Sequence, residues 1–171
     1  NSIMISLDRM NAIQKIKPEA KVAIVESGAI LENIHQVADA NDMIFPLFFG
    51  ARGSAMIGGN LSTNAGGSNV LRYGNTRDLC LGLEVVLADG RVMNLMSELR
   101  KDNTGLNLKN IFIGAEGTLG IITAAVLRLH RKPLAYVTAM VGLKDLKESL
   151  SLLNRLQNET SGGVEAFEFM P

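Results

Sequence analysis

Apolar residues recur along this chain with two different periods, and their alternation predicts a domain that mixes helices with strands. An amphipathic helix is expected over 30–41, where Ile30, Ile34 and Val37 follow helical spacing. Asp89-Gly90 between two apolar runs is the strongest hairpin signal in the chain. The other expected elements are strands over 3–7, 21–26, 81–88, 91–95 and 121–130, helical turns over 9–14 and 108–113, and a short helix over 57–65.

These hairpin signals alternate with short helical patterns, so we expect an α+β fold. Its sheet should be mixed but largely antiparallel and flanked by helices. The pattern changes after Pro133, where a strand over 136–143, an amphipathic helix over 144–157 and a strand over 163–169 follow one another. We therefore predict one domain over 1–132 and the beginning of a second over 133–171.

Two stretches rich in glycine and short polar residues hold the candidate chemistry, Gly50–Gly67 and Gly114–Thr123. Backbone without side chains lets N–H groups approach an anionic or planar ligand, and Ser, Thr and Asn add short polar arms. Glycines also cluster in turns for conformational reasons alone. The first stretch is flanked by the apolar segments 43–49 and 79–87, which is unlike a solvated linker and favours a ligand-binding loop. The short helix over 57–65 is expected to turn its first amides toward that ligand.

The order of motifs along the chain carries a family resemblance. The succession IGGNLSTNAGG, RYGN, LGLEVVLADG, RKDNTG and FIGAEGTLGIIT resembles the FAD-linked oxidases of the vanillyl-alcohol-oxidase type. Within them it is most similar to flavin D-2-hydroxyacid dehydrogenases, such as enzymes that oxidise D-lactate, D-2-hydroxyglutarate or glycolate. The resemblance implies FAD as cofactor and a PCMH-type FAD-binding subdomain followed by the start of a ferredoxin-like cap domain. Neither GxGxxG after a strand nor GxxxxGK[ST] is present, so the sequence does not support a Rossmann or P-loop site.

The resemblance also assigns cofactor-binding residues. In the first stretch they are Gly50, Ala51, Gly53, Ser54, Ile57, Gly58, Gly59, Asn60, Thr63, Asn64, Ala65 and Gly66. In the second they are Glu116, Gly117, Gly120, Ile121 and Ile122, the two isoleucines through their main chain. Core packing is the alternative role for the three isoleucine side chains, and capping of the next turn is the alternative for Glu116. Leu106 stands where the family often has an aromatic residue, which weakens assignment of a substrate but not of the flavin.

The implied activity is oxidation of a D-2-hydroxy acid to the 2-oxo acid, with electrons passed to an acceptor that the sequence does not identify. A sugar or alcohol oxidase, an alkyl-transferring relative and a non-catalytic FAD-binding subunit are the alternatives. The resemblance places a pyrophosphate-binding loop upstream of Ile3, and catalytic histidines and metal ligands downstream of this segment. We therefore expect no catalytic residue and no metal ligand here, and weak binding of FAD by the segment alone.

The composition of the chain limits the kinds of partner that it is expected to bind. Hydrophobic residues make up 47% of the chain and charged residues 20%, which suits a folded core. The 17 basic and 17 acidic residues balance, so no nucleic-acid partner is expected. Apolar runs are too short to span a membrane and no signal peptide is visible, so we expect a cytoplasmic location. A homodimer is one expectation for the assembly.

The remaining residues with reactive side chains have plain structural interpretations. Cys80, the one cysteine, is expected to be a small core residue. His35 and His130 are expected to be structural or solvated, because no carboxylate pattern surrounds them. Arg72 and Arg77 suit either a phosphate clamp or a surface ion pair.

Overall fold

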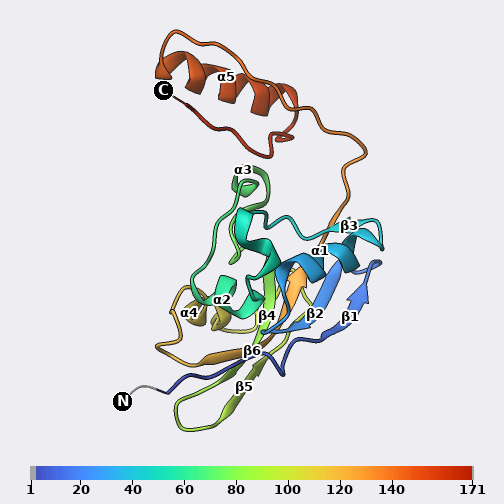
Figure 1. Cartoon of the computed structure of the whole chain (residues 1–171), viewed down its shortest axis with the longest axis vertical. Coiled ribbons are helices and arrows are strands. Elements are labelled where there is room, and N and C mark those ends of the chain that lie inside the picture. The colour runs from blue at the N-terminus through green and yellow to red at the C-terminus, as the bar shows by residue number, and fades with distance from the viewer. Residues whose placement is uncertain (1–2, 171) are drawn as a thin grey trace.

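The structure is a computed structural model that describes residues 3–170. At its centre lies a five-stranded sheet in the order β1-β2-β6-β4-β5, with each pair of neighbours antiparallel (Figure 1). The strands are β1 (Ile13–Lys17), β2 (Val22–Glu26), β4 (Cys80–Val86), β5 (Val92–Leu95) and β6 (Ile121–Arg128). A second sheet pairs β3 (Met43–Ile44) with β7 (His130–Arg131). The predicted α+β fold with a largely antiparallel sheet is confirmed.

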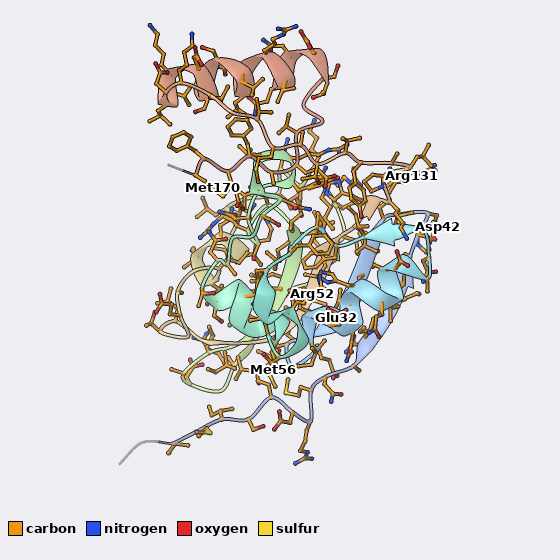
Figure 2. The ribbon with its side chains drawn as sticks, turned by 45° about the horizontal axis from the view of Figure 1, so that its top comes forward. Glu32, Asp42, Arg52, Met56, Arg131 and Met170 are labelled. Carbon is orange, nitrogen blue, oxygen red and sulfur yellow. The ribbon has the colours of Figure 1, made fainter. Side chains whose placement is uncertain are left out.

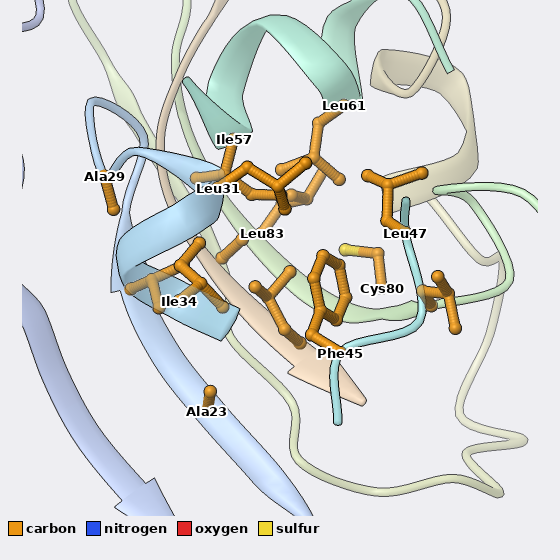
Figure 3. Close-up of a cluster of buried hydrophobic side chains, with 14 of the residues drawn as sticks. Ala23, Ala29, Leu31, Ile34, Phe45, Leu47, Ile57, Leu61, Cys80 and Leu83 are labelled. Carbon is orange, nitrogen blue, oxygen red and sulfur yellow. The ribbon is translucent and has the colours of Figure 1, made fainter. Parts of the chain in front are cut away.

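The helical elements are α1 (Leu31–Asp39), the 3-10 turn η1 (Gly50–Gly53), α2 (Ile57–Ser62), α3 (Val70–Tyr73), α4 (Lys109–Phe112) and α5 (Leu146–Glu159). α5 lies apart from the large sheet (Figure 1). α1 and α2 lie against the sheet (Figure 1), and between them and the strands lies the core. Figure 3 shows Leu31 and Ile34 of α1 near Leu61 of α2, Leu83 of β4 and the ring of Phe45. All five side chains are fully buried. This burial fixes α2, and with it the first glycine-rich stretch, on the sheet.

The central strand and the hairpin follow directly from the sequence. β6 lies between β2 and β4 and is apolar at nearly every position, as expected for a strand covered on both faces. The β4–β5 hairpin closes through a bond from Leu87 N to Arg91 O (2.9 Å). Gly90 has φ +84° in that turn, a conformation that favours glycine.

At the N-terminal end two predictions were wrong. Residues 3–7 form no strand, and Ile3 and Met4 are exposed, because no described strand offers them an edge to pair with. The helical turn expected over 9–14 is replaced by β1, which the sequence analysis missed. β1 pairs with β2 from Ile13 opposite Val25 to Lys17 opposite Val22, so this long-range pairing overrides the local pattern.

Beyond Pro133 only the helix was predicted correctly. α5 begins after Asp145, whose carboxylate accepts a hydrogen bond from Glu148 N (2.8 Å) as an N-cap. The strands expected over 136–143 and 163–169 are irregular segments, because neither finds a pairing partner within residues 3–170. Residues 133–170 therefore form one helix with two unpaired flanking segments.

Candidate functional site

The fold brings the two glycine-rich stretches together at the end of α2. Gly114 N donates to Leu61 O (3.0 Å), and Glu116 N donates to Ser62 O (2.9 Å). A Cβ on Gly114 would lie 3.4 Å from Asn64 Cβ, so the two backbones touch. The second stretch therefore caps the carbonyl end of the helix that the first stretch forms.

The beginning of α2 differs from the expectation. Ile57 N donates to Ala29 O (3.0 Å), and Gly58 N donates to Ser27 O (2.8 Å). The first two amides of the helix are thus bonded to the loop after β2 and do not face a ligand, contrary to the prediction. These backbone hydrogen bonds attach the short helix to the loop after β2. No local sequence pattern predicts them.

Five of the six glycines of the first stretch fall into two groups. A Cβ at Gly58 would lie 2.7 Å from Ser27 Cβ, and at Gly67 it would lie 2.6 Å from Phe48 O, so close packing excludes a side chain at both positions. At Gly50, Gly53 and Gly59 a Cβ would meet nothing within 4 Å, and none of the three has a positive φ. Neither packing nor backbone conformation within the described chain explains glycine at this second group.

Several donors at the same place have no partner among residues 3–170. Asn60 is 6% exposed, yet its side-chain Nδ2 makes no hydrogen bond. The backbone amides of Gly59, Gly66 and Gly117 likewise find no acceptor in the described part of the chain. A buried amide donor without a partner costs about 1–3 kcal/mol, and this cost applies to Asn60 Nδ2, which therefore suits an acceptor that the protein itself does not supply. The three glycines are exposed, so their amides are open to solvent or to a ligand.

Other polar arms of the first stretch are already engaged. Thr63 Oγ1 donates to Gly59 O (3.0 Å), and Ser54 Oγ donates to Ala51 O (3.3 Å). Asn64, with φ +48°, accepts a bond from Arg77 N (3.0 Å) on its side-chain oxygen. Ala65 bonds the chain at both backbone groups, through Ala65 N to Asn60 O (2.8 Å) and Thr76 Oγ1 to Ala65 O (2.6 Å). These four residues shape the loop.

The second stretch ends in a strand edge. Ile121 and Ile122 pair with β4, whereas β2 pairs with β6 only from Ala124 onward, so one backbone edge of both isoleucines lies beyond β2. The Ile122 side chain is in the core, and so is Ile57. The alternative of core packing therefore holds for these two side chains. A contact with the cofactor could involve only their main-chain groups.

The remaining residues of the second stretch differ in their packing. A Cβ on Gly120 would lie 2.7 Å from Val85, so that glycine is required by packing. Glu116 is exposed with φ +52°, and its carboxylate makes no hydrogen bond within residues 3–170. The capping role considered for its side chain is therefore not seen.

The two arginines have different structural roles. Arg77 donates from Nη1 to Asn110 O and from Nη2 to Ile113 O, each at 2.5 Å, and so ties the segment between α3 and β4 to the C-terminal end of α4. Arg72 pairs with Glu165 (2.9 Å), which matches the ion-pair alternative. Both guanidinium groups are therefore bonded within the protein, which does not favour a role as a phosphate clamp.

His35, His130 and Cys80 are packed within the fold. Cys80 is 2% exposed, and burial raises the pKa of its thiol to about 12. His35 stacks on Phe48 at 4.5 Å, and burial lowers the pKa of its imidazole. Burial and then the nearby Arg128 lower the pKa of His130 to about 4. Among residues 3–170, no three His, Cys, Asp or Glu side chains gather as a metal site would require.

A groove of about 700 Å³ runs beside the first stretch. Gly50, Gly67 and Ser68 line it together with the aromatic rings of Phe48 and Phe49 and the carboxylate of Glu168. Arg52, which also lines the groove, reaches Glu32 of α1 through Nε (2.6 Å), and Figure 2 shows the two residues side by side. The aromatic walls and the side-chain-free backbone suit a planar, partly polar ligand.

Two residues that no sequence pattern marked join this region in the fold. Ser27, fully buried at the end of β2, contacts Gly58 and leaves its Oγ without a partner in the described residues. Glu165 reaches α3 from the far end of the chain. No local signal marks either residue, because each role depends on a neighbour that is distant in sequence.

Comparison with known proteins agrees with the geometry. The chain is 44% identical over 170 residues to the mitochondrial D-2-hydroxyglutarate dehydrogenase of Danio rerio, covering 99% of this chain and 32% of that protein. It is 39% identical to D-2-hydroxyglutarate–pyruvate transhydrogenase of Saccharomyces cerevisiae, covering 99% of this chain and 34% of that protein. A solved alkyldihydroxyacetonephosphate synthase has a TM-score of 0.65 at 27% identity, over 74% of this chain and 22% of that one. The chain thus spans about a third of the length of the curated relatives it matches.

The names of the relatives correct one expectation. The dehydrogenases of Danio rerio, Bos taurus and Arabidopsis thaliana are named as mitochondrial, so the cytoplasmic location expected from the sequence was wrong. Within residues 3–170 no helix has the length and hydropathy needed to cross a membrane.

The family itself is established by a match that covers more than half of the chain. The family described as FAD binding domain matches residues 1–96, a range that includes the whole first stretch and the β4–β5 hairpin. The antiparallel sheet, the joined glycine-rich stretches and this match lead to one conclusion: the chain belongs to the FAD-binding domain family, and its cofactor is FAD.

Proposed function

We propose that the two joined stretches hold FAD and that the protein containing them oxidises a D-2-hydroxy acid to the 2-oxo acid. The observation that carries the proposal is Gly59. This residue lies inside α2, where glycine costs about 0.5–1 kcal/mol relative to alanine. Nothing in the described chain would obstruct a Cβ there, so an approaching ligand is the remaining physical reason for the missing side chain.

The donors around Gly59 fit the same ligand. Its own amide and the amides of Gly66 and Gly117 are unpaired within residues 3–170, and Asn60 Nδ2 is buried without an acceptor. FAD offers acceptors of matching kind on its pyrophosphate, its ribityl chain and the polar edge of its ring. The groove walls Phe48 and Phe49 add apolar surface.

We therefore propose the following division of roles. Asn60 and the free amides would orient the cofactor, and Gly50, Gly53 and Gly59 would let backbone approach it closely. The open edge of Ile121 and Ile122 would meet the adenosine end through main-chain groups. The residues proposed to contact the cofactor are Gly50, Ala51, Gly53, Gly59, Asn60, Gly66, Glu116, Gly117, Ile121 and Ile122. The other residues that the sequence indicated are proposed to shape the loops that hold it: Ser54, Ile57, Gly58, Thr63, Asn64, Ala65 and Gly120.

The reaction is inferred from the relatives. Bound FAD supplies the acceptor for the hydride that leaves the substrate Cα. Two relatives at 44% and 36% identity, from Danio rerio and Stutzerimonas stutzeri, are named D-2-hydroxyglutarate dehydrogenases, which supports a D-2-hydroxy acid as substrate. This chain would contribute position, through the aromatic and glycine-lined groove.

The two-domain division is also proposed, with the boundary near residue 132. β7 ends at Arg131, after which the chain leaves the sheets and leads to α5 (Figure 1). Tyr136, Val137 and Met140 are exposed beyond this point, which suits a segment that packs with further structure. A homodimer stays a proposal supported by the same exposed apolar surface, and sedimentation velocity would test it.

The test uses the protein expressed with the flanking sequence of its gene. After purification, the visible flavin absorbance is followed without oxygen while D-2-hydroxyglutarate, D-lactate or glycolate is added, with L-2-hydroxyglutarate as the matched control. We expect the flavin to be reduced by a D-2-hydroxy acid and not by the L enantiomer.

Other results would point to the alternatives. Reduction by sugars or simple alcohols alone would indicate an oxidase of another branch. Bound flavin that no D-2-hydroxy acid reduces would contradict the proposed reaction, and a purified protein without flavin would contradict the proposed site.

A further inference from the structure

A carboxylate near the C-terminal end is bound by two neighbouring residues of α3. Glu165 Oε1 accepts a hydrogen bond from Tyr73 Oη (2.9 Å) and another from Arg72 Nη1 (2.9 Å). The Arg72 guanidinium also lies 5.1 Å from the centre of the Tyr73 ring. Three groups from chain positions some ninety residues apart therefore form one compact contact, which we call the Glu165 clasp.

The surroundings of the clasp favour a carboxylate. Below Tyr73 lies His130, edge-to-face at 4.7 Å, and burial with the cations Arg128 and Arg100 lowers the pKa of this imidazole to about 4. His130 is consequently neutral at physiological pH, while arginines surround it. Glu165 brings the negative charge that this cation-rich corner lacks.

The clasp is placed to affect the groove beside the first glycine-rich stretch. Glu168, three residues after Glu165, lines that groove opposite Gly50, Gly67 and Ser68. Figure 1 shows the C-terminal segment passing over α3, in agreement with the two bonds to Glu165. Backbone hydrogen bonds do not fix residues 164–170 within the described structure, so the clasp is their main polar attachment to the FAD-binding domain.

We propose that Glu165 is a positioning residue: by binding Arg72 and Tyr73 it docks the C-terminal segment on α3 and so shapes the groove in which an acid substrate meets the FAD-binding stretch. The substrate part of this inference rests on the proposed function. The docking part rests only on the contacts of Glu165, and it is tested separately.

The docking test exploits the spectroscopy of the chain, which contains two tyrosines and no tryptophan. A Tyr136→Phe background leaves Tyr73 as the single chromophore. Burial and then the bond to Glu165 raise the pKa of Tyr73 to about 12, so the titration of its ultraviolet absorbance reports the clasp. We expect Glu165→Gln to lower this midpoint by about one unit or more toward the ordinary value near 10.

A matched control and a second readout keep the result clear. Glu159→Gln removes another carboxylate of the C-terminal part, one that pairs with Arg155 on exposed α5 and lies outside the clasp. It should leave the midpoint unchanged. At pH 7, chymotryptic cleavage after Phe167 should accelerate several-fold in Glu165→Gln and in Arg72→Met but not in the control. An unchanged midpoint together with unchanged cleavage in Glu165→Gln would overturn the docking.

The functional part is measured on the flavin-loaded protein with its flanking sequence. We expect Glu165→Gln to raise KM for the D-2-hydroxy acid at least about threefold, with a smaller change in kcat, because the groove loses shape while the cofactor stays bound. Equal KM in the variant and the control would refute the positioning role. Because the tyrosine and cleavage readouts need no flavin, they succeed or fail independently of the proposed reaction.

Discussion

Substitution by alanine is expected to have opposite effects on stability at the two adjacent glycines of α2. At Gly59 a new methyl group would meet no protein atom within 4 Å, whereas at Gly58 it would lie 2.7 Å from Ser27 Cβ and 3.0 Å from Ser27 O. The two positions share one helix and one flanking sequence. Gly59→Ala and Gly58→Ala therefore form a matched pair that separates ligand space from packing space.

The expected magnitudes follow from these distances. Gly59→Ala should stabilise the fold by about 0.5–1 kcal/mol, because alanine loses less backbone entropy in a helix. Gly58→Ala gains the same propensity, but an overpacked core costs about 1–3 kcal/mol, and Ser27 is held by backbone bonds and cannot easily retreat. A net loss on the order of 1 kcal/mol is expected, and 1 kcal/mol corresponds to about 2–4 °C in Tm for a chain of this size.

Flavin binding should respond in the other direction at Gly59. If the cofactor approaches the bare Cα, the methyl group displaces it, and we expect FAD affinity to fall at least about tenfold, equivalent to about 1.4 kcal/mol. Urea unfolding followed by circular dichroism gives the stability of each variant. Flavin content after gel filtration, in protein carrying its flanking sequence, gives the binding.

The stability measurement tests the packing argument, and the flavin measurement tests the ligand argument. A Gly59→Ala protein that is more stable and keeps its full flavin would show that the open space at this residue is not the cofactor site. A Gly59→Ala protein that is destabilised would show that the space is filled in solution by the chain itself. Unchanged stability in Gly58→Ala would mean that Ser27 moves freely.

Three further predictions concern the frame of the site. The pKa of His130 is lowered in the folded state to about 4, so the unfolded chain binds the proton first as pH falls. The free energy of unfolding should therefore decrease as pH drops from about 6.5 toward 4, by about 1–2 kcal/mol after discounting for a half-buried ring. In urea unfolding, His130→Phe should lose this part of the pH dependence. The Cys80 thiol, buried and raised in pKa, should react with a maleimide about 10³-fold or more slowly in the folded than in the urea-unfolded chain; comparable rates would place it at the surface. Arg77→Lys should destabilise the chain by about 1–3 kcal/mol, because one ammonium cannot bond both Asn110 O and Ile113 O, and a thermal melt identical to the parent would contradict that bridging role.

Local patterns were sufficient wherever the chain interacts with its near neighbours. The β4–β5 hairpin follows from Asp89-Gly90, and α1 follows from its helical spacing of apolar residues. The strand β6 was predicted from the alternating pattern over 121–130. The ordered motifs also identified the family that the comparison established.

Elements that depend on a distant partner could not be read in this way. β1 exists because β2 offers it an edge, while the similar apolar segment 3–7 finds no edge among the described residues and stays irregular. The segments 136–143 and 163–169 have strand-like composition and the same outcome. Composition measures whether a segment suits a strand, and pairing decides whether it becomes one.

Within the site the division is sharper. The sequence by itself identified this as an FAD-binding chain and predicted which two stretches supply backbone to the cofactor. Only the tertiary structure distinguished Gly58, excluded from having a side chain by Ser27, from Gly59, which faces open space. It also bonded the first amides of α2 to the loop after β2 and brought Glu165 to Tyr73. The physical reason is common to all three: a glycine, an amide or a carboxylate looks the same in any sequence, and its role is set by the atoms that folding places within a few ångströms of it.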